Sequence, residues 1–427
     1  MSRPAELLCQ RRFLPLFITQ FLGALNDNVL KNALIVLFTF QAAGWTTLAP
    51  GILANLAAGI FILPFFLFSA TAGQLADKVD KAFLARLVKQ LEILIVGVAG
   101  LGFALQSLEI LLASLFLLGL HSTLFGPVKY AILPQHLKPD ELIAGNALIE
   151  SGTFVAILAG TLLGGLLAAV PGATLWITAA GLVIAVLGLL AARAIPPAVP
   201  PAPTLSINRN VFAETAHILG LARENRPVFG AIFGISWFWL YGAIFLAQIP
   251  AYAKIILGGD ETSVTLLLTA FIVGIGAGSM LCERLTRNHA GRSLKLVLPG
   301  GLGLSVFALD LYFASQHVVP GSAAAGALAL LDVPGIVRVL VDLALLGLCG
   351  GLFTVPLYTR LQQASTPAQR ARMIAANNIM NALFMVVGSL GAATLLAAGG
   401  SIPALFAVLA VGNGAALLAL RHVGVRG

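Results

Sequence analysis

The sequence predicts an all-α membrane protein with twelve transmembrane helices in two six-helix halves. Of its 427 residues, 59% are hydrophobic and only 10% are charged, whereas a soluble domain carries about 25% charged residues. Apolar runs fill nearly the whole chain, and a spanning helix needs about 20 such residues. Alternating segments of about ten residues, which would indicate a membrane β-barrel, are missing from the sequence. A soluble enzyme and a disordered or fibrous protein are therefore excluded.

Twelve segments are long and apolar enough to cross a bilayer. They are residues 14–40, 48–72, 84–105, 108–133, 142–169, 175–194, 228–253, 264–281, 294–314, 336–358, 373–398 and 402–420. The first segment follows a short basic start but is too long for the apolar core of a signal peptide. We therefore expect it to be retained as a membrane helix.

The distribution of lysine and arginine predicts the orientation of the chain. With the N-terminus inside, all but three of the 25 cations fall before the first segment, after the last, or at inside junctions. The exceptions are Lys31, Lys254 and Arg338. The positive-inside rule then places both termini in the cytoplasm. The net charge of +8 reads as an orientation signal and a contact for anionic lipid, and a nucleic-acid partner is not expected.

A proline-rich break divides the chain into two parts. We expect an N-terminal half at 1–194, a cytoplasmic linker at 195–227 and a C-terminal half at 228–427. Within the linker, residues 210–223 match a short amphipathic helix that could rest on the membrane through Phe212, Ile218 and Ala222, with Glu214 in water. A partly ordered linker is the alternative. Similar proline and asparagine patterns after the fourth and tenth spans support an internal repeat.

The first span carries the most informative polar residues. Gln20, Asp27 and Lys31 fall within about 40° of one another on a helical wheel, with Asn28 beside them. Asp27 lies halfway along the span, where a charge is costly and normally faces a cavity or a partner. Asp27 and Lys31 can pair at i,i+4. We expect a surface that binds a substrate head group; a fixed salt bridge that only packs the bundle is the alternative.

Further polar candidates lie in the fourth and fifth spans. His121 is near the middle of the fourth span, and Lys129 and Tyr130 are near its inner end. Asn146 and Glu150 occupy the first turns of the fifth span at a similar depth. All five are candidates for substrate contact. A structural histidine and a Lys129–Glu150 pair that closes the hairpin are the alternatives.

The second half is poorer in buried charge and richer in aromatic residues. Its seventh span contributes Trp237, Trp239 and Tyr241, of which Tyr241 is a candidate substrate contact. One polar half that faces an apolar, aromatic half suits an amphiphile better than a sugar. No nucleophile elbow, phosphate loop or paired metal ligands occur in the sequence, and its three cysteines are far apart. We expect a protein without cofactor or metal that is not an enzyme.

The loop after the second span has a pattern of its own. It reads Gly73-Gln-Leu-Ala-Asp77-Lys-Val-Asp80-Lys81 and resembles the signature loop of the major facilitator superfamily, with Asp80 in place of its second glycine. Gly73 permits a tight turn, and Asp77 can accept hydrogen bonds from the N-terminus of a neighbouring helix. The resemblance implies that this helix is the eleventh and that Gly73, Asp77 and Lys81 latch the outward-open state. A solvated loop is the alternative.

Small residues repeat at helical spacing in the fifth and eighth spans. Gly160 and Gly164 recur in the fifth, and Gly274 and Gly278 in the eighth. In the superfamily arrangement these two helices face each other across the halves, so we expect smooth faces that let the halves rock. Tight packing alone is the alternative.

Three stretches together are similar to the bacterial lysophospholipid transporter family. They are Phe17-Ile-Thr-Gln-Phe-Leu-Gly-Ala-Leu-Asn26-Asp27-Asn28 continued by Lys31-Asn-Ala, then Phe125-Gly-Pro-Val-Lys129-Tyr130-Ala-Ile-Leu-Pro134, and Asn146-Ala-Leu-Ile-Glu150. The likeness is greatest to the transporter portion of fusions with acyltransferases. Since this chain stops at Gly427, we expect any acyltransferase to be a separate protein.

The resemblance implies a flippase of the bacterial inner membrane. It would move lysophospholipids such as lysophosphatidylethanolamine and lysophosphatidylglycerol from the outer to the inner leaflet for reacylation. Asp27 would meet an ammonium group, and Lys31 or Lys129 the phosphate. Besides the substrate, membrane lipids are the expected partners. A proton-coupled exporter of drugs or amphiphiles, with Asp27, His121 or Glu150 as proton site, is the alternative. A non-transporting scaffold would not need charges at the bilayer centre.

Overall fold

The apolar segments fold into long helices in the computed structural model, which describes residues 4–40, 50–287, 290–318 and 326–422. The N-terminal half contains α2 (Leu14–Phe40), α3 (Pro50–Lys78), α4 (Lys81–Ala104), α5 (Leu108–His136), α6 (Leu142–Ala169) and α7 (Ala173–Arg193). The C-terminal half contains α9 (Arg226–Ala251), α10 (Glu261–Thr286), α11 (Val297–Ser315), α13 (Ile336–Ala364), α14 (Arg370–Ala397) and α15 (Ile402–His422). Short helices are α1 (Pro4–Leu7), α8 (Val211–Glu224), α12 (Ala327–Leu330), a π-helical turn at Tyr252–Ile256 and 3-10 turns at Ala290–Leu296 and Pro367–Gln369.

Side chains just outside the apolar runs fix where several helices begin. Asp80 accepts a hydrogen bond from Phe83 N at 2.8 Å and starts α4. Asp260 starts α10 by accepting from Thr262 N at 2.8 Å. These caps satisfy backbone donors that a helix leaves free at its first turn.

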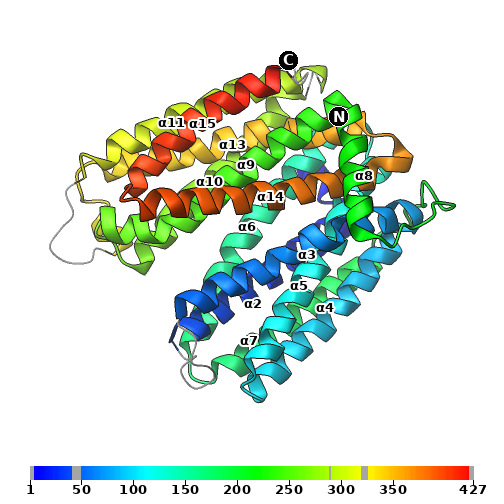
Figure 1. Ribbon diagram of the computed structural model, residues 1–427, viewed down its shortest axis with the longest axis horizontal. Coiled ribbons are helices and arrows are strands. Elements are labelled where there is room, and N and C mark those ends of the chain that lie inside the picture. The colour runs from blue at the N-terminus through cyan, green and yellow to red at the C-terminus, as the bar shows by residue number, and fades with distance from the viewer. Residues whose placement is uncertain (1–3, 41–49, 288–289, 319–325, 423–427) are drawn as a thin grey trace.

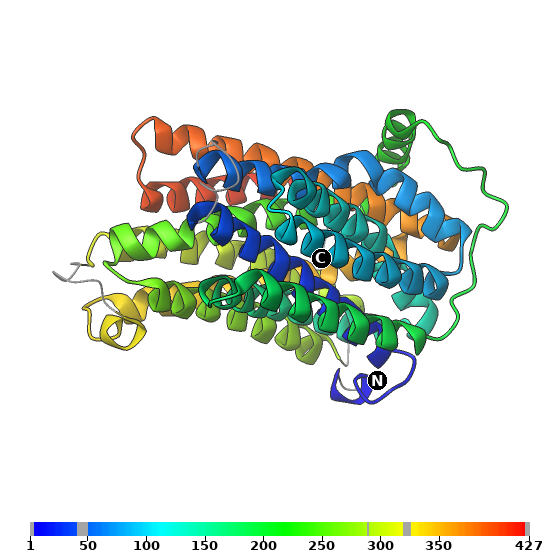
Figure 2. The ribbon, with the colours of Figure 1, turned by 90° about the horizontal axis from the view of Figure 1, so that it is seen from below.

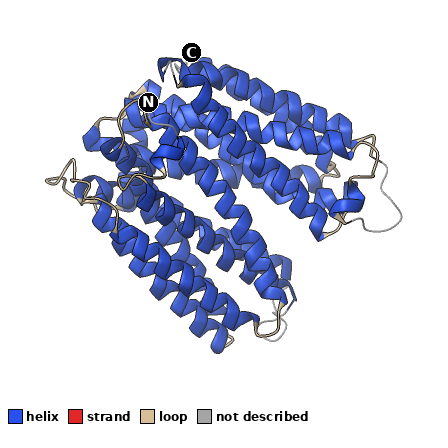
Figure 3. Ribbon diagram, turned by 180° about the vertical axis from the view of Figure 1, so that it is seen from behind, coloured by secondary structure: helices blue, strands red, loops and turns tan. Residues whose placement is uncertain are grey.

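The helices form two bundles that lie side by side (Figure 1). Helices α2 to α7 make up one bundle, and the helices from α9 onward make up the other. The start of α2 and the end of α15 lie at the same end of the molecule, and the views from below and behind show the same arrangement (Figures 2 and 3). Twelve of the described helices are long and apolar enough to span a membrane. The predicted all-α membrane fold is confirmed.

Helices α6 and α10 pack against each other across the halves, as predicted, but the glycines that were expected to smooth this contact face helices of their own half. A Cβ built on Gly160 would lie 2.5 Å from Leu25 O, and one on Gly164 would lie 2.5 Å from Val29 O, both on α2. Gly274 and Gly278 are similarly crowded by the backbone of α13. The small residues therefore let backbones within one half approach each other.

Helix α8 lies against the bundle, with contacts to α3, α9 and α14 (Figure 2). Ile218 and Ala222 are fully or almost fully buried there, and Glu214 is only 5% exposed. The prediction that Ile218 and Ala222 rest on the membrane and that Glu214 faces water is therefore wrong. Phe212, by contrast, is 76% exposed.

The linker that leads to α8 follows the ends of α3 and α4. Ala198 N donates to Asp80 Oδ2 at 2.7 Å, Ala202 N donates to Asp77 O at 3.0 Å, and Asn208 N donates to Gln74 Oε1 at 2.7 Å. The segment between the halves is thus tied to the N-terminal half before it reaches α8.

Candidate substrate site within the membrane

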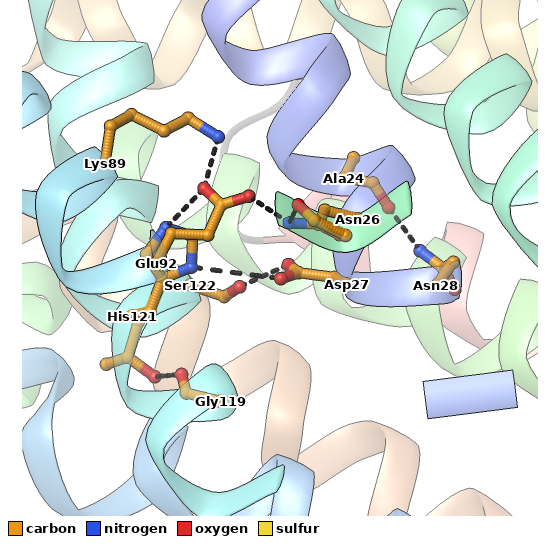
Figure 4. A network of polar contacts seen from close by, with 11 residues as sticks. Ala24, Asn26, Asp27, Asn28, Lys89, Glu92, Gly119, His121 and Ser122 are labelled. Carbon is orange, nitrogen blue, oxygen red and sulfur yellow. Dashed lines mark hydrogen bonds and ion pairs between the residues drawn. The ribbon is translucent and has the colours of Figure 1, made fainter. Parts of the chain in front are cut away.

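Asp27 projects from the middle of α2 toward α5. Ser122 of α5 donates a hydrogen bond to Asp27 Oδ2, and His121 Nδ1 lies 3.8 Å from Asp27 Oδ1 (Figure 4). The Asp27 side chain keeps 13% of its surface exposed. A carboxylate at this depth with one neutral donor and no cation in direct contact is poorly neutralised, which makes it a binding group for a cation.

Behind Asp27 lies a second carboxylate, Glu92 of α4, which is completely buried. It accepts hydrogen bonds from Lys89 Nζ at 2.5 Å and from Asn26 Nδ2 at 2.6 Å, and His121 Nε2 lies 3.1 Å from its Oε2 (Figure 4). We call Asn26, Asp27, Lys89, Glu92, His121 and Ser122 the Asp27 cluster. Its helices α2, α4 and α5 all belong to the N-terminal half.

The fold makes room for the buried ammonium of Lys89. A Cβ built on Gly23 of α2 or on Gly188 of α7 would lie 3.0 Å from Lys89 Nζ. Lys89 is therefore enclosed between helices, although its sequence position suggested a cytoplasmic cation near the second loop. Lys89 is therefore not an exposed cation of that loop.

Four members of the Asp27 cluster were missed as candidate site residues: Asn26, Lys89, Glu92 and Ser122. Lys89 and Glu92 stand three residues apart near the start of a predicted span, a spacing that also suits a solvated helix end. The signal that could have found them is that both positions fall inside the apolar segment 84–105. A charged pair inside a span points to a buried partner.

The predicted Asp27–Lys31 pair does not form. Lys31 Nζ donates to Asn28 Oδ1 at 3.0 Å and lies 5.2 Å from the centre of the Phe61 ring. Asn28 also donates to Ala24 O at 2.8 Å. Lys31, one turn beyond Asp27, thus bonds to Asn28. The Asp27 carboxylate faces α5 instead.

Gln20 lies on the same helix, two turns before Asp27. Its Oε1 accepts a hydrogen bond from Thr153 of α6 at 3.0 Å, and its buried Nε2 has no hydrogen-bond partner among the described residues. Gln20 therefore keeps a free donor, as a contact for an anionic group requires.

Tyr130, Glu150 and Lys129 form a separate group closer to the ends of α5 and α6. Tyr130 donates to Glu150 Oε1, and Lys129 Nζ lies 4.8 Å from the centre of the Tyr130 ring. Among the described residues, Lys129 and Glu150 make no ion pair within 4.0 Å. The predicted Lys129–Glu150 pair is therefore replaced by a phenol–carboxylate hydrogen bond and a cation–π contact.

These residues meet the C-terminal half directly. The Tyr130 ring stacks on Tyr358 of α13 with 4.5 Å between centroids, and Trp239 Nε1 donates to Tyr358 OH at 3.0 Å. Asn146 Nδ2 donates to Gln362 Oε1 at 2.7 Å, and Gln362 Nε2 donates back to Asn146 Oδ1 at 3.0 Å. Asn146 is fully buried in this exchange, so it ties the halves together and offers no free group to a substrate.

Asp77 joins α3 to the first turn of α14. Its Oδ1 accepts from Ala371 N at 3.0 Å, and its Oδ2 accepts from Arg372 N at 3.3 Å and Arg372 Nε at 3.1 Å. A Cβ on Gly73 would lie 2.7 Å from Ala375 Cβ, so glycine allows α3 and α14 to touch. Lys81 is also buried, and its Nζ has no hydrogen-bond partner in the described part of the chain.

The contacts between the halves described above share one end of the bundle. Asp77 is near the end of α3, Asn146 near the start of α6, and Tyr358 and Gln362 near the end of α13. We call this set, with Gly73, Tyr130 and the first turn of α14, the inter-half contact. It lies at the end of the molecule where α2 begins and α15 ends (Figure 1).

Tyr241 lies apart from both groups. It is fully buried, its OH donates to Leu304 O on α11 at 2.8 Å, and its ring stacks on Phe245. Its side chain therefore packs inside the C-terminal half, away from the Asp27 cluster, and its contact with substrate stays a prediction. Two other aromatic residues of α9 do reach the N-terminal half: Trp239 stacks on Phe154 of α6 at 5.8 Å, and Phe238 meets the same ring edge-on at 6.1 Å.

The described residues place no three His, Cys, Asp or Glu side chains where they could hold a metal ion. The chemistry available at the Asp27 cluster is therefore ionic and hydrogen-bonded recognition, together with proton transfer between histidine and carboxylate.

Comparison with known proteins agrees with this architecture. The chain is 28% identical over 353 residues to a lysophospholipid transporter of an Enterobacter species (81% of this chain and 78% of the relative), and 26% identical over 387 residues to one of Citrobacter koseri (88% and 87%). The crystal structure of a human organic anion transporter superposes with a TM-score of 0.77 at 15% identity, covering 97% of this chain and 99% of that one. The model of the Major Facilitator Superfamily matches residues 16–335. The chain therefore belongs to the major facilitator superfamily.

Proposed function

We propose that this protein is a lysophospholipid transporter that moves lysophosphatidylethanolamine and related single-chain lipids between the leaflets of the bacterial inner membrane. The observation that carries the proposal is Asp27, an acidic residue midway along a spanning helix that has no lysine or arginine within ion-pair distance among the described residues. The similarity to curated lysophospholipid transporters supports the same substrate class.

The arrangement of polar and aromatic groups suits a lipid with one charged end. The Asp27 carboxylate would hold the head-group ammonium, and Lys31, one turn away, would meet the phosphate. Phe154 and Trp239 stack on each other between the halves, and separation of the halves would expose these apolar rings. A single acyl chain can lie along such a surface and remain near lipid, which a sugar would not require.

Transport would follow from rocking of the two halves. The inter-half contact closes one end of the bundle through Asp77, Asn146 and the Tyr130–Tyr358 stack. With both termini in the cytoplasm, as the positive-inside rule predicts, the closed end is the cytoplasmic one. A lysolipid would then enter from the outer leaflet, and opening of the inter-half contact would release it to the inner leaflet for reacylation by an acyltransferase.

Transport by purified protein tests the proposal. The protein is reconstituted in liposomes with radiolabelled lysophosphatidylethanolamine, and albumin extracts the label that remains in the outer leaflet. We expect protein-dependent protection of the label, and a roughly 10- to 100-fold slower rate for Asp27→Ala, because a hydrogen-bonded charge contributes about 1.5–3 kcal/mol.

Asp310→Asn is the matched control. Asp310 is also an acidic residue of a membrane helix, but it lies in the C-terminal half, where it pairs with Arg338 of the same half. It should transport like the native protein. No protection by the native protein would overturn the proposed function. Protection that Asp27→Ala leaves unchanged would remove Asp27 from the site.

A proton-coupled exporter of amphiphiles is the second candidate, and the position of His121 between two carboxylates favours it. Collapse of the pH gradient distinguishes the two functions. A proton-driven exporter stops, whereas a facilitative carrier continues to move lysophosphatidylglycerol.

A further inference from the structure

His121 lies between two carboxylates that differ in how many hydrogen bonds they accept. On one side is Glu92, whose oxygens face Lys89, Asn26 and the imidazole Nε2. On the other side is Asp27, whose Oδ1 lies 3.8 Å from His121 Nδ1 and has no hydrogen-bond partner among the described residues. The two ring nitrogens therefore face two different acids.

Both ring nitrogens of His121 lie close to an acid without a hydrogen bond in the described part of the chain. Lys89 and Asn26 hold Glu92 in a fixed position, with His121 Nε2 3.1 Å from its Oε2. Nδ1 faces Asp27 Oδ1 at 3.8 Å. With a proton on both nitrogens, the imidazolium would face a carboxylate on each side.

The net charge of the Asp27 cluster depends on whether this proton is bound. Lys89 and Glu92 cancel, which leaves the negative charge of Asp27. A proton, on His121 or on the Asp27 carboxyl itself, restores neutrality, and so does a cation bound at Asp27. An uncompensated charge is costly inside a membrane, so the two events are alternatives that exclude each other.

We propose that His121 binds a proton that is exchanged for the head-group ammonium when a lysolipid binds at Asp27. Lys89 and Glu92 act as positioning residues that fix the orientation of the His121 ring. The proton leaves Nδ1 for water as the ammonium pairs with Asp27, so charge is conserved. The inference rests on the proposed function and adds that amine-bearing head groups are proton-linked, whereas glycerol head groups are not.

Other charged groups lie near this exchange but do not replace it. On α2, Lys31 is held by Asn28, and on α5, Lys129 lies over Tyr130. Glu150 of α6 accepts from Tyr130. From α3 and α14, the charged groups in contact are those of the inter-half contact, Asp77 and Arg372. His121 is thus faced by Asp27 from α2 and by Glu92 and Lys89 from α4.

The exchange predicts the sign of a pH effect. A protonated His121 competes with the ammonium for Asp27, so affinity for lysophosphatidylethanolamine rises with pH. One linked proton changes affinity by up to about tenfold per pH unit. Lysophosphatidylglycerol carries no ammonium, so its affinity should not rise over the same range.

Proton release on binding is the direct test. The full-length protein in phosphatidylcholine nanodiscs is mixed with lysophosphatidylethanolamine in weakly buffered solution containing a pH dye, from roughly pH 5.5 to 8, where histidine titrates. We expect about one proton per bound lysolipid at the low end of this range and none with lysophosphatidylglycerol. Binding of both lipids is measured in parallel with radiolabel.

Two variants locate the proton. His121→Gln should bind both lipids without proton release, whereas His317→Gln, at an exposed histidine after α11, should release protons like the native protein. Glu92→Gln removes the anion beside Nε2 and should move the release midpoint to lower pH, with binding of lysophosphatidylglycerol as the check on folding. An unchanged midpoint would remove Glu92 as a positioning residue.

The outcomes separate the two proposals. Binding of lysophosphatidylethanolamine without proton release, or equal release with both lipids, would overturn the exchange and leave the transporter proposal intact. Release that persists in His121→Gln would place the proton elsewhere and would also overturn it. Binding of neither lipid would overturn the transporter proposal, and the exchange with it.

Discussion

Asp77 is the residue whose removal should change the balance between the two conformations most clearly. Its carboxylate accepts three hydrogen bonds from the first turn of α14, two of them from backbone N–H groups and one from the Arg372 guanidinium. Asp77→Ala leaves these buried donors without their acceptor and removes the negative charge that the helix N-terminus favours.

The expected shift can be estimated from these contacts. When the halves separate at this end, water can replace the carboxylate, so only the net difference between the two states counts. We take about 2–3 kcal/mol for the charged hydrogen bonds, which changes the ratio of closed to open forms roughly 30- to 150-fold. The shift favours the form that is open at the inter-half contact.

Distances between spin labels measure this shift. Labels at Lys78→Cys and Ala368→Cys report the gap between α3 and the start of α14. Cys9 is exposed and is replaced by serine, whereas Cys282 and Cys349 are buried. The Asp77→Ala variant should show a longer, newly populated distance in electron–electron double resonance.

Asp80→Ala is the matched control for this experiment. Asp80 is also a carboxylate that caps a helix, but it caps α4 and binds the linker at Ala198 N, both away from α14. It should leave the label distance unchanged. A distance distribution in Asp77→Ala that matches the native protein, or an equal shift in both variants, would refute the assignment of Asp77 as a latch.

Two further substitutions test the packing described above. Tyr241→Phe removes the hydroxyl that bonds Leu304 O and should cost about 1 kcal/mol of stability with unchanged lysolipid transport; lost transport with normal folding would return Tyr241 to the site. Gly164→Leu should destabilise the protein by about 1–3 kcal/mol, because a Cβ there would lie 2.5 Å from Val29 O. Gly165→Ala, which meets nothing within 4 Å, should melt like the native protein, and equal melting of both variants would contradict the packing.

The sequence predicted those features of the molecule that depend on local chemistry. Apolar length alone predicted the twelve spans, because the bilayer imposes a minimum on each. Asp27 stood out because a carboxylate halfway through an apolar helix is costly. Asp77 stood out because a carboxylate in a short loop can cap another helix, although the partner helix came from the family resemblance.

The errors concern partners that only the packing of helices decides. The i,i+4 spacing allowed an Asp27–Lys31 pair, but α5 places Ser122 and His121 closer to the carboxylate. Lys89 appeared to belong to a loop, because nothing in its own neighbourhood shows that glycines on α2 and α7 leave space for an ammonium. Tyr241 was expected to contact substrate, but its hydroxyl donates to Leu304 O on α11.

The position of a bound lysolipid is the most direct test of the site. A cryo-electron microscopy structure of the protein in nanodiscs with lysophosphatidylethanolamine should show the ammonium within about 4 Å of the Asp27 carboxylate, the distance of an ion pair, and the acyl chain between the halves. Density for the lipid only on the outer surface, with Asp27 still bound to Ser122 and nothing else, would contradict a head-group site at the centre of the membrane.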